Sequence, residues 1–230
     1  MDTPDNMVKK AVSLVENGAT TIKLIIGETV NRDIDRIRAV REAVGNKIGI
    51  RIGANSHYQV DNAITLIRKI EKYNILHVEA PVNKNDLLGM AKVNIAVETP
   101  IMSDENVRIP IEAINLINLG AVDIFKLKVT KMGFDIAERI LNTANDNGIK
   151  CILGHMMQLG IAGTAEAHFA LAHPELVEPH EIGNFHLIGI AEDIINEPVS
   201  AEPNRFTLHR GNGLGVTLNR ERIERYRLGN

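Results

Sequence analysis

The amino-acid sequence predicts an α/β protein of the TIM type, a parallel (β/α) barrel in which seven strands can be recognised. Apolar runs typical of buried strands alternate with amphipathic helical patterns, which indicates βα units and a parallel sheet. The first six predicted strands end at residues 27, 53, 79, 104, 128 and 154, so neighbouring ends are 24 to 26 residues apart. A constant period of this length indicates a repeated supersecondary unit. Reactive side chains lie at several of these ends, as on the C-terminal face of a barrel.

A doubly wound sheet is the competing architecture. It would need a glycine-rich phosphate turn after its first strand, whereas residues 27–29 read Gly-Glu-Thr. A closed barrel of this type has eight strands, and the sequence begins with the helix that ought to follow strand one. We therefore expect an incomplete barrel, whose missing strand lies elsewhere in the chain, comes from another copy, or is absent because the chain is a fragment.

The elements are predicted from short apolar runs for strands and from apolar stripes at the helical period for helices. The strands are expected over residues 21–26, 47–52, 75–78, 100–102, 122–129, 149–153 and, more weakly, 176–182. The helices are expected over residues 4–16, 32–44, 61–70, 87–92, 111–119, 134–147, 164–171 and 220–227. Asn31 and Asp61 are the expected N-caps of the second and third helices, because their side-chain oxygens can accept hydrogen bonds from free N–H groups. Residues 1–196 are predicted to form the barrel domain, and residues 197–230 a closing segment of the same domain.

The composition of the chain bears on which kinds of molecule it could bind. The formal net charge of −3 and the aromatic content of 3% give no reason to expect nucleic acid or a membrane surface as a partner. No apolar stretch is long enough to span a bilayer, and the first residues do not resemble a signal peptide. The one cysteine, Cys151, excludes an internal disulfide framework and fits a cytoplasmic protein.

Residues 99–133 predict a strand, a helix and a second strand around which a site is organised. The first strand ends at the acid pair Asp104 and Glu105. The second carries Lys126 and Lys128 on one face, because side chains two apart in a strand point the same way. A right-handed crossover sets the strands parallel, with acid and amine at matching ends. Such a set suits a metal site with an acid/base beside it, and an exposed charge pair in a loop is the alternative for any single charge.

Ordered motifs extend this pattern along the chain: IKLIIG (22–27), RIGANSHY (51–58), HVEAP (77–81), MSDEN (102–106), FKLKVTKMG (125–133), GHMMQLGI (154–161) and GNGLGVTLNRERIERYR (211–227). They resemble the enolase superfamily, specifically the C-terminal barrel domain of the mandelate racemase/muconate lactonizing enzyme family and its muconate-lactonising and dipeptide-epimerase branch. The resemblance runs from about residue 18 to the tail. It implies an Mg²⁺ ion held by three acids on consecutive strands, with lysines on either side of a substrate α-carbon.

By this resemblance, Glu79 and Asp104 are the second and third metal ligands, and Asn55 matches a family asparagine whose carbonyl could lend a weak oxygen. Lys128 matches the base on the sixth strand, and Lys23 matches the first lysine of a Lys-x-Lys pair, a charge partner for the site. General chemistry independently supports a metal ion beside a base at such a site. Removing a proton next to a carboxylate creates a dianionic enolate, which only a nearby cation makes accessible. Mg²⁺ prefers hard oxygen ligands such as these.

The sequence departs from the family pattern at three site positions. Gly53 stands where the first metal acid is expected, Ile25 where the second lysine and other base is expected, and Gln158 where a glutamate usually follows the seventh strand. No segment of these 230 residues resembles the family's N-terminal capping domain, which selects substrates, so we expect a site without that cap. We therefore expect Mg²⁺ binding to be weak or lost, and an acid restored at position 53 to tighten it by at least about tenfold.

The remaining candidates have structural alternatives. His155, just after the sixth strand, faces the predicted barrel mouth and could replace a missing acid/base, and His57 has a weaker claim of the same kind. Lys126 and Lys131 are expected to be solvated or paired with nearby acids, and Glu105 to support Asp104 or Lys128. Surface or capping roles are expected for the other histidines, which are His168, His173, His180, His186 and His209.

Three functions stay open at this point. The leading one is an Mg²⁺-dependent isomerase or lyase that abstracts the proton α to the carboxylate of a small substrate, by epimerisation, cycloisomerisation or dehydration. The alternative is a catalytically degenerate family member that acts as a non-enzymatic binding or assembly barrel. The third is a Schiff-base lysine at Lys126 or Lys128. Because an open barrel leaves edge strands unpaired, we also expect a homo-oligomer, with another copy or the tail (197–218) covering the gap beside strand 21–26.

Overall fold

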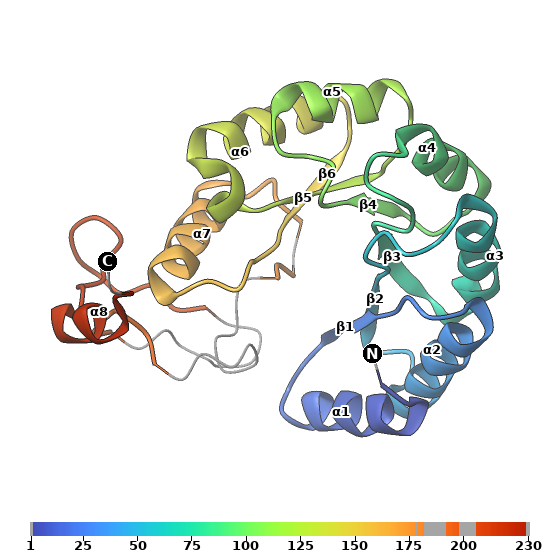
Figure 1. The fold of residues 1–230 in the computed structure, drawn as a ribbon, viewed down its shortest axis with the longest axis horizontal. Coiled ribbons are helices and arrows are strands. Elements are labelled where there is room, and N and C mark those ends of the chain that lie inside the picture. Colours follow the sequence, from blue (N-terminus) through green and yellow to red (C-terminus); the bar gives the residue numbers. More distant parts are fainter. Residues whose placement is uncertain (1, 178, 182–191, 198–205, 229–230) are drawn as a thin grey trace.

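Parallel strands form a curved sheet, and helices pack along its outer side (Figure 1). The computed structural model describes residues 2–177, 179–181, 192–197 and 206–228. Within these ranges six strands are hydrogen-bonded in chain order: β1 (Thr21–Ile25), β2 (Gly49–Gly53), β3 (Ile75–Glu79), β4 (Ile101–Ser103), β5 (Ile124–Leu127) and β6 (Lys150–Leu153). The arrangement confirms the prediction of an α/β protein with an incomplete TIM-type barrel, and it corrects the strand count from seven to six.

The helices follow the predicted apolar stripes. They are α1 (Pro4–Glu16), α2 (Val30–Val44), α3 (Val60–Ile70), α4 (Leu87–Ala96), α5 (Pro110–Asn118), α6 (Val129–Asp146), α7 (Gly160–Ala172) and α8 (Arg220–Tyr226), with a short 3₁₀ turn η1 (Glu71–Tyr73) after α3. Across the described ranges, no helix is both long enough and apolar enough to cross a membrane.

Side chains alternate between the two faces of the sheet, as strand geometry requires. On β5, Phe125 and Leu127 are fully buried in the main apolar core, which lies between the sheet and the helices. Ile124 belongs to the opposite, inner face, where it joins Met102 and Ile152 in a small separate apolar cluster. Polar side chains can therefore gather further along the inner face without entering the main core.

The seventh predicted strand, residues 176–182, is not a regular strand in the part of the chain that the structure describes. Residues 178 and 182 lie outside the described ranges. The N–H of Val177 donates to the carbonyl of Cys151 at 2.8 Å, and the N–H of Glu181 donates to that of Leu153 at 2.8 Å. The segment thus follows the edge of β6, and Pro179, which has no N–H to donate, interrupts the ladder.

Two predicted helix caps are wrong. The side chain of Thr29, rather than that of Asn31, caps α2 by accepting a hydrogen bond from the N–H of Arg32. Helix α3 begins at Val60, so Asp61 lies in its first turn instead of at its N-cap. Both helices begin earlier than predicted, each with a valine, Val30 or Val60, that packs against the core.

The predicted strand over residues 122–129 is too long. Strand β5 ends at Leu127, and Lys128 is the N-cap residue of α6. Gly133 has a φ of 78° inside α6 and kinks that helix, which explains why the apolar pattern predicted a helix only from residue 134. Lys128 therefore sits at the junction of strand and helix.

The described part of the tail lies beside α7. Leu218 forms an antiparallel bridge with Ile195, and the carbonyl oxygen of Leu214 is 3.2 Å from Nε2 of His168. In Figure 1, α8 and the C-terminus lie well away from β1. Tail residues 206–218 therefore do not cover β1, which leaves another copy as the predicted cover, and residues 198–205 lie outside the described ranges. Within the described chain, β1 pairs only with β2.

Candidate active site

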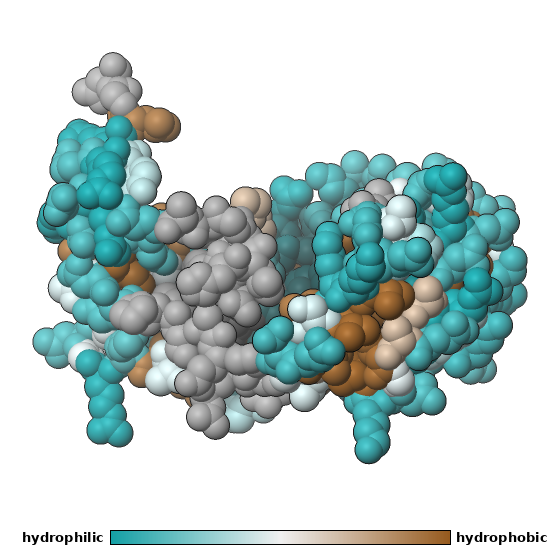
Figure 2. Space-filling view, turned by 90° about the horizontal axis from the view of Figure 1, so that it is seen from below, coloured by the Kyte–Doolittle hydropathy of each residue, from teal (hydrophilic) through white to brown (hydrophobic). Residues whose placement is uncertain are grey.

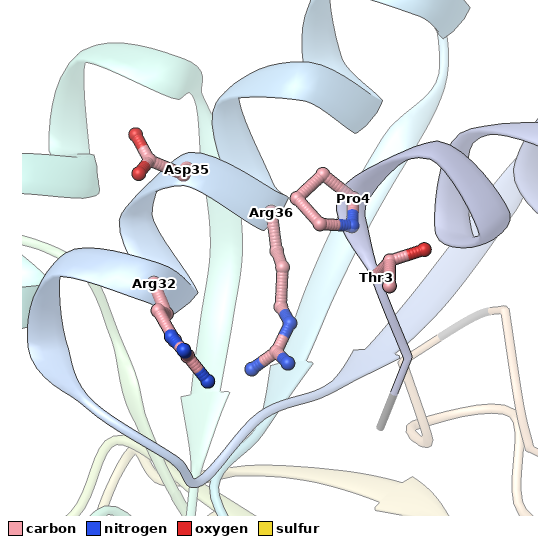
Figure 3. Close-up of a pocket in the computed structure, with 5 residues that line it drawn as sticks. All are labelled: Thr3, Pro4, Arg32, Asp35 and Arg36. Atoms are coloured by element: carbon pink, nitrogen blue, oxygen red, sulfur yellow. The ribbon is translucent and has the colours of Figure 1, made fainter.

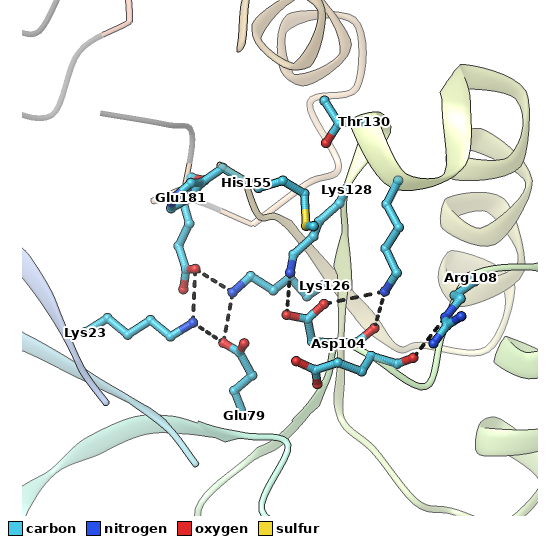
Figure 4. A network of polar contacts seen from close by, with 12 residues as sticks. Lys23, Glu79, Asp104, Arg108, Lys126, Lys128, Thr130, His155 and Glu181 are labelled. Atoms are coloured by element: carbon cyan, nitrogen blue, oxygen red, sulfur yellow. Dashed lines mark hydrogen bonds and ion pairs between the residues drawn. The ribbon is translucent and has the colours of Figure 1, made fainter. Parts of the chain in front are cut away.

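Lysines and carboxylates meet at the C-terminal ends of the strands, on the inner face of the sheet (Figure 4). Because the strands are parallel, their last inward-facing side chains converge at one rim. We call this set the lysine–carboxylate cluster, and its members are Lys23, Arg51, Glu79, Asp104, Lys126, Lys128, Lys131 and Glu181.

Two carboxylates share two ammonium groups in one half of the cluster. Nζ of Lys126 is 2.5 Å from Oε2 of Glu181 and 2.9 Å from Oε2 of Glu79. Nζ of Lys23 is 2.5 Å from the same oxygen of Glu79 and 3.3 Å from that of Glu181. Burial alone would lower the pKa of Lys126, but the charges of Glu79 and Glu181 outweigh it and raise that pKa above its ordinary value. Lys126 is therefore an ammonium ion.

Asp104 forms the other half of the cluster with Lys128 and Lys131. Nζ of Lys128 is 2.6 Å from Oδ2 of Asp104. Nζ of Lys131 donates to the backbone carbonyl of Asp104 at 3.0 Å and is 3.7 Å from Oδ1. Burial by itself would raise the pKa of Asp104, yet the charges of Lys128 and Lys126 hold that pKa below its ordinary value. Asp104 is therefore an anion at neutral pH.

Positive charge is in excess in the cluster. The three carboxylates face five cations, since Nη1 of Arg51 also lies 3.7 Å from Oε1 of Glu181. An excess of two positive charges at a partly enclosed rim attracts a small anion, because the low-dielectric walls screen the charges less than water does.

Two glycines make room for the lysine side chains. A Cβ atom at Gly154 would lie only 2.2 Å from Cε of Lys126, so the stem of Lys126 occupies the space of a side chain at position 154. A Cβ atom at Gly53 would lie 2.9 Å from Cε of Lys23 and 2.9 Å from Cδ1 of Ile25. Position 53 therefore faces the cluster, as the resemblance implied for a ligand position.

The other predicted site residues lie around the cluster. Asn55 is exposed in the β2–α3 loop with a φ of 48°, outside the ion pairs that define the cluster. His155 is half-buried beside Glu181, with Nδ1 2.9 Å from the backbone carbonyl of that residue, and burial lowers its pKa. His57 is exposed, and its Nε2 is 3.3 Å from the carbonyl of Glu28. The roles predicted for Lys23, Lys128 and His155 remain predictions.

Mg²⁺ does not fit the side chains in this arrangement. Oε2 of Glu79 and Oδ2 of Asp104, on two of the predicted ligands, are already bound by ammonium groups. Oδ1 of Asp104 and Oε1 of Glu181 are buried without a hydrogen-bond partner in the part of the chain that the structure describes, but each has a cation at 3.7 Å. Among the described residues, no group of three or more His, Cys, Asp or Glu side chains is placed to hold a metal ion. A divalent cation needs several hard oxygen ligands with net negative charge, and this cluster has a net positive charge.

Sequence reasoning missed Glu181 and Glu166. A strand end was due near residue 179, one period after Gly154, and this signal could have located Glu181. Glu166 of α7 is fully buried, and Oε2 accepts a hydrogen bond from Nε2 of Gln158 at 2.5 Å. Burial raises the pKa of Glu166 to about 7. Gln158 is thus a partner of Glu166, and a buried acid on an alanine-rich helix leaves no periodic signal.

A surface pocket lies elsewhere, between the N-terminal ends of α1 and α2 (Figure 3). Thr3, Pro4, Arg32, Asp35 and Arg36 line it. Arg36 is already engaged there, because it donates to the carbonyl of Asp2 at 2.8 Å and to Asp33 at 2.7 Å. The pocket contains none of the predicted site residues, so the candidate active site is the lysine–carboxylate cluster.

A family model and sequence relatives each match most of this chain. The family model described as enolase C-terminal domain-like matches residues 6–222. The hydrophobic dipeptide epimerase of Enterococcus faecalis is 36% identical over 220 residues, which are 94% of this chain and 61% of the relative. The L-Ala-D/L-Glu epimerase of Bacillus subtilis is 36% identical over 174 residues, 74% of this chain and 48% of the relative. The chain therefore spans less than two thirds of the length of these relatives.

Solved structures agree with the sequence relatives. The dipeptide epimerase of Enterococcus faecalis, complexed with Mg and the dipeptide L-Leu-L-Tyr, superposes with a TM-score of 0.88 at 33% identity. That match covers 94% of this chain and 61% of the other. A muconate lactonizing enzyme superposes with a TM-score of 0.93 over 100% of this chain and 65% of the other, at 22% identity, and supports the fold alone.

Proposed function

The chain belongs to the enolase C-terminal domain-like family, as its motifs predicted, and we propose that its lysine–carboxylate cluster abstracts the proton α to the carboxylate of a small substrate. The reaction class is that of an isomerase. The names of its relatives support this class, because they are dipeptide epimerases, an N-succinyl-L-Arg/Lys racemase and muconate cycloisomerases. We propose that the substrate of this chain is a small carboxylate, similar in size to the dipeptides named for these relatives.

The observation that carries the proposal is the excess of positive charge around the amine of Lys128. Lys128 lies at the strand–helix junction, and its Nζ is 2.6 Å from Asp104. Lys23 and Lys131 are the more exposed lysines of the cluster, with 24% and 18% of their side chains accessible. They are the groups that an entering carboxylate meets, so a substrate is bound by its charge and held with its α-carbon towards Lys128.

Proton transfer then follows from the contacts of Lys128. The ammonium of Lys128 first gives up a proton to water, while Asp104, at 2.6 Å, stays an anion and holds the amine in place. The neutral amine takes the α-proton and becomes an ammonium ion again, while the electron pair of the C–H bond enters the enolate. The ammonium groups of Lys23 and Lys131 stabilise the charge that develops on the enolate oxygens. Return of the proton from Lys128 to carbon completes the exchange.

The opposite face of the substrate has no matching base in this proposal. By the resemblance, that face belongs to position 25, and Ile25 cannot titrate. Ile25 is 37% exposed at the end of β1, so its side chain borders the open site. We therefore propose one-sided chemistry, in which the α-proton of one enantiomer exchanges or an elimination occurs without efficient interconversion of enantiomers.

The test is to incubate dipeptides and N-acyl amino acids of both configurations with the chain in D₂O. Proton NMR follows loss of the α-proton signal, and optical rotation follows configuration. We expect exchange in one enantiomer at constant rotation, and loss of exchange in Lys128→Met, with an exposed-lysine variant such as Lys9→Met as the matched control. Rapid racemisation would show that another group, with His155 the first to examine, serves the second face. No exchange across the panel would favour a binding or assembly barrel without catalysis.

We also propose that the chain self-associates through the region of β1. Within the described chain, β1 has a partner on one side only, and an uncovered strand edge offers unpaired N–H and C=O groups to another chain. Figure 2 shows apolar side chains gathered on the face that carries α1. Leu14 of α1 is 37% exposed, as is Ile25 at the end of β1. A second copy of the chain would cover both the edge and this apolar surface.

A further inference from the structure

The ammonium group of Lys126 lies between two carboxylates at the centre of the cluster. It is 2.5 Å from Glu181 and 2.9 Å from Glu79, and the residue is only 2% exposed. We propose that Lys126 is the resident cation of this site, holding the position beside Glu79 that a divalent cation would need, so that the cluster assembles without a metal ion. The inference deepens the proposed function and rests on it only for the substrate, because the identity of the cation can be measured without turnover.

The chain makes specific room for this ammonium group. Cε, Cδ and Cγ of Lys126 would lie 2.2, 2.8 and 2.8 Å from a Cβ at Gly154, so the whole stem crosses a position that only glycine leaves open. Three atoms of close approach fix the path of the side chain, and that path ends between Glu79 and Glu181. A surface ion pair formed by chance would need no such accommodation in a neighbouring strand.

Gly53, at the position predicted for the first metal ligand, also makes the cluster less suited to a divalent cation. Gly53 supplies no carboxylate, and the space next to it is occupied by Lys23, whose Cε would be 2.9 Å from a Cβ there. Lys23 also binds both Glu79 and Glu181. One negative charge is therefore missing at position 53, and one positive charge is present at position 126. Both changes make the cluster less attractive to a divalent cation and more attractive to an anion.

Lysines bind one oxygen of each carboxylate in the cluster. Within the described ranges, Oδ1 of Asp104 and Oε1 of Glu181 are buried without a hydrogen bond and lie 3.7 Å from Lys131 and Arg51, respectively. Oε2 of Glu79 receives two ammonium groups, and Oδ2 of Asp104 receives a third from Lys128. A divalent cation beside Glu79 would have to displace the ammonium group of Lys126. The stem of Lys126 is already packed over Gly154, so it leaves little room for the ammonium group to move away. Removing the ammonium group, by contrast, would leave Glu79 and Glu181 facing each other with only Lys23 between them.

The experiment compares Mg²⁺ binding by the native chain, Lys126→Met and Lys131→Met. Methionine keeps most of the buried lysine stem and removes its charge. Lys131→Met is the matched control, because it also removes one ammonium group from the cluster but one that is 3.7 Å from Oδ1 of Asp104 and not between two carboxylates. Calorimetric titration with MgCl₂ and thermal unfolding with and without MgCl₂ report binding independently of activity.

We expect no binding heat and no change in unfolding temperature for the native chain at about 10 mM Mg²⁺. Lys126→Met should bind Mg²⁺ saturably with a Kd of about 1 mM or less, at least about tenfold below that concentration, whereas Lys131→Met should show no binding heat, like the native chain. Saturable Mg²⁺ binding by the native chain would overturn the proposal. Equal Mg²⁺ binding by Lys126→Met and Lys131→Met would also overturn it. The gain in binding would then come from the lower positive charge of the cluster and not from the position of Lys126.

A second variant protects the test against a folding defect. Lys126→Gln keeps hydrogen-bonding capacity towards Glu79 and Glu181 and should show the same gain in Mg²⁺ binding. If neither variant folds, the native titration still decides, because binding there contradicts a resident ammonium cation. Failure of the exchange assay with small carboxylates would refute the proposed function and leave these binding results unaffected.

Discussion

Replacing Glu166 with glutamine should stabilise the protein at alkaline pH and leave its stability in acid nearly unchanged. Glu166 is fully buried in α7, and burial raises its pKa from the ordinary 4.5 to about 7. Nε2 of Gln158 donates to one carboxyl oxygen at 2.5 Å, and Oγ1 of Thr130 donates to the other at 3.2 Å. A glutamine can retain both contacts, since its oxygen accepts from Gln158 and its NH₂ group can face the hydroxyl of Thr130.

The sign follows from which state holds the proton more tightly. The folded chain binds the proton of Glu166 up to pH about 7, whereas the unfolded chain releases it near pH 4.5. The contribution to stability is therefore complete below about pH 4.5 and is lost as the pH rises through about 7. The interval between these values, at 1.36 kcal/mol for each pH unit, corresponds to about 3 kcal/mol. Glu166→Gln removes this loss.

The assay is denaturant unfolding of the native chain and Glu166→Gln at a series of pH values from about 4 to about 8. The difference in unfolding free energy should grow in favour of the variant by about 3 kcal/mol across this range. Glu138→Gln, an exposed position on α6, is the matched control and should follow the native curve within about 0.5 kcal/mol. Parallel curves for the native chain and Glu166→Gln would refute the reasoning, because a constant difference carries no titration.

Two further predictions concern packing and assembly. Gly154→Ala should lower the unfolding free energy by about 1–3 kcal/mol, because its Cβ would displace the stem of Lys126 from a contact of 2.2 Å. Unchanged stability in denaturant unfolding would show that the Lys126 stem has another path. Light scattering should report a particle of at least two chains, because β1 has one paired edge among the described strands. A monomer at high concentration would contradict assembly through β1.

The fold was predictable because its signal is repeated. Each strand end recurs after 24 to 26 residues, so one uncertain strand hardly weakens the interpretation of the others. The caps were less predictable, since Thr29 and Asn31 are both competent N-cap residues and local sequence does not choose between them. The segment after α7 was hardest, because its pairing with β6 is interrupted by Pro179, and apolar content alone does not show which N–H groups are available.

The sequence predicted the strand-end positions of three members of the cluster, but it missed Glu181, placed Asn55 with them, and did not predict the ion pairs. Glu79, Asp104 and Lys128 were placed at strand ends by periodicity and resemblance, and the structure brings them to one rim. Which ammonium meets which carboxylate depends on distances across the curved sheet. Lys126 was expected to be solvated or paired with a nearby acid, and its partners prove to be Glu79 and Glu181, both far from it in sequence.

Gly53 shows why a family position cannot be interpreted without its neighbours. Resemblance alone predicts that Gly53→Asp supplies a missing metal ligand and tightens Mg²⁺ binding. In the structure, a Cβ at this position lies 3.6 Å from Nζ of Lys23, so a new carboxylate would meet that ammonium group first. The acid would then add an ion pair to the cluster, while Lys126 still occupied the place beside Glu79.

The two substitutions should therefore act together. We expect Gly53→Asp alone to show no Mg²⁺ binding at about 10 mM, like the native chain, and the same change made in Lys126→Met to tighten the affinity of that variant by a further tenfold or more, about 1.4 kcal/mol. Calorimetric titration of the four chains in this cycle measures the coupling directly. Tight Mg²⁺ binding by Gly53→Asp with Lys126 in place would mean that an acid can displace the ammonium group. In that case the missing carboxylate, and not the buried lysine, is what separates this site from a metal site.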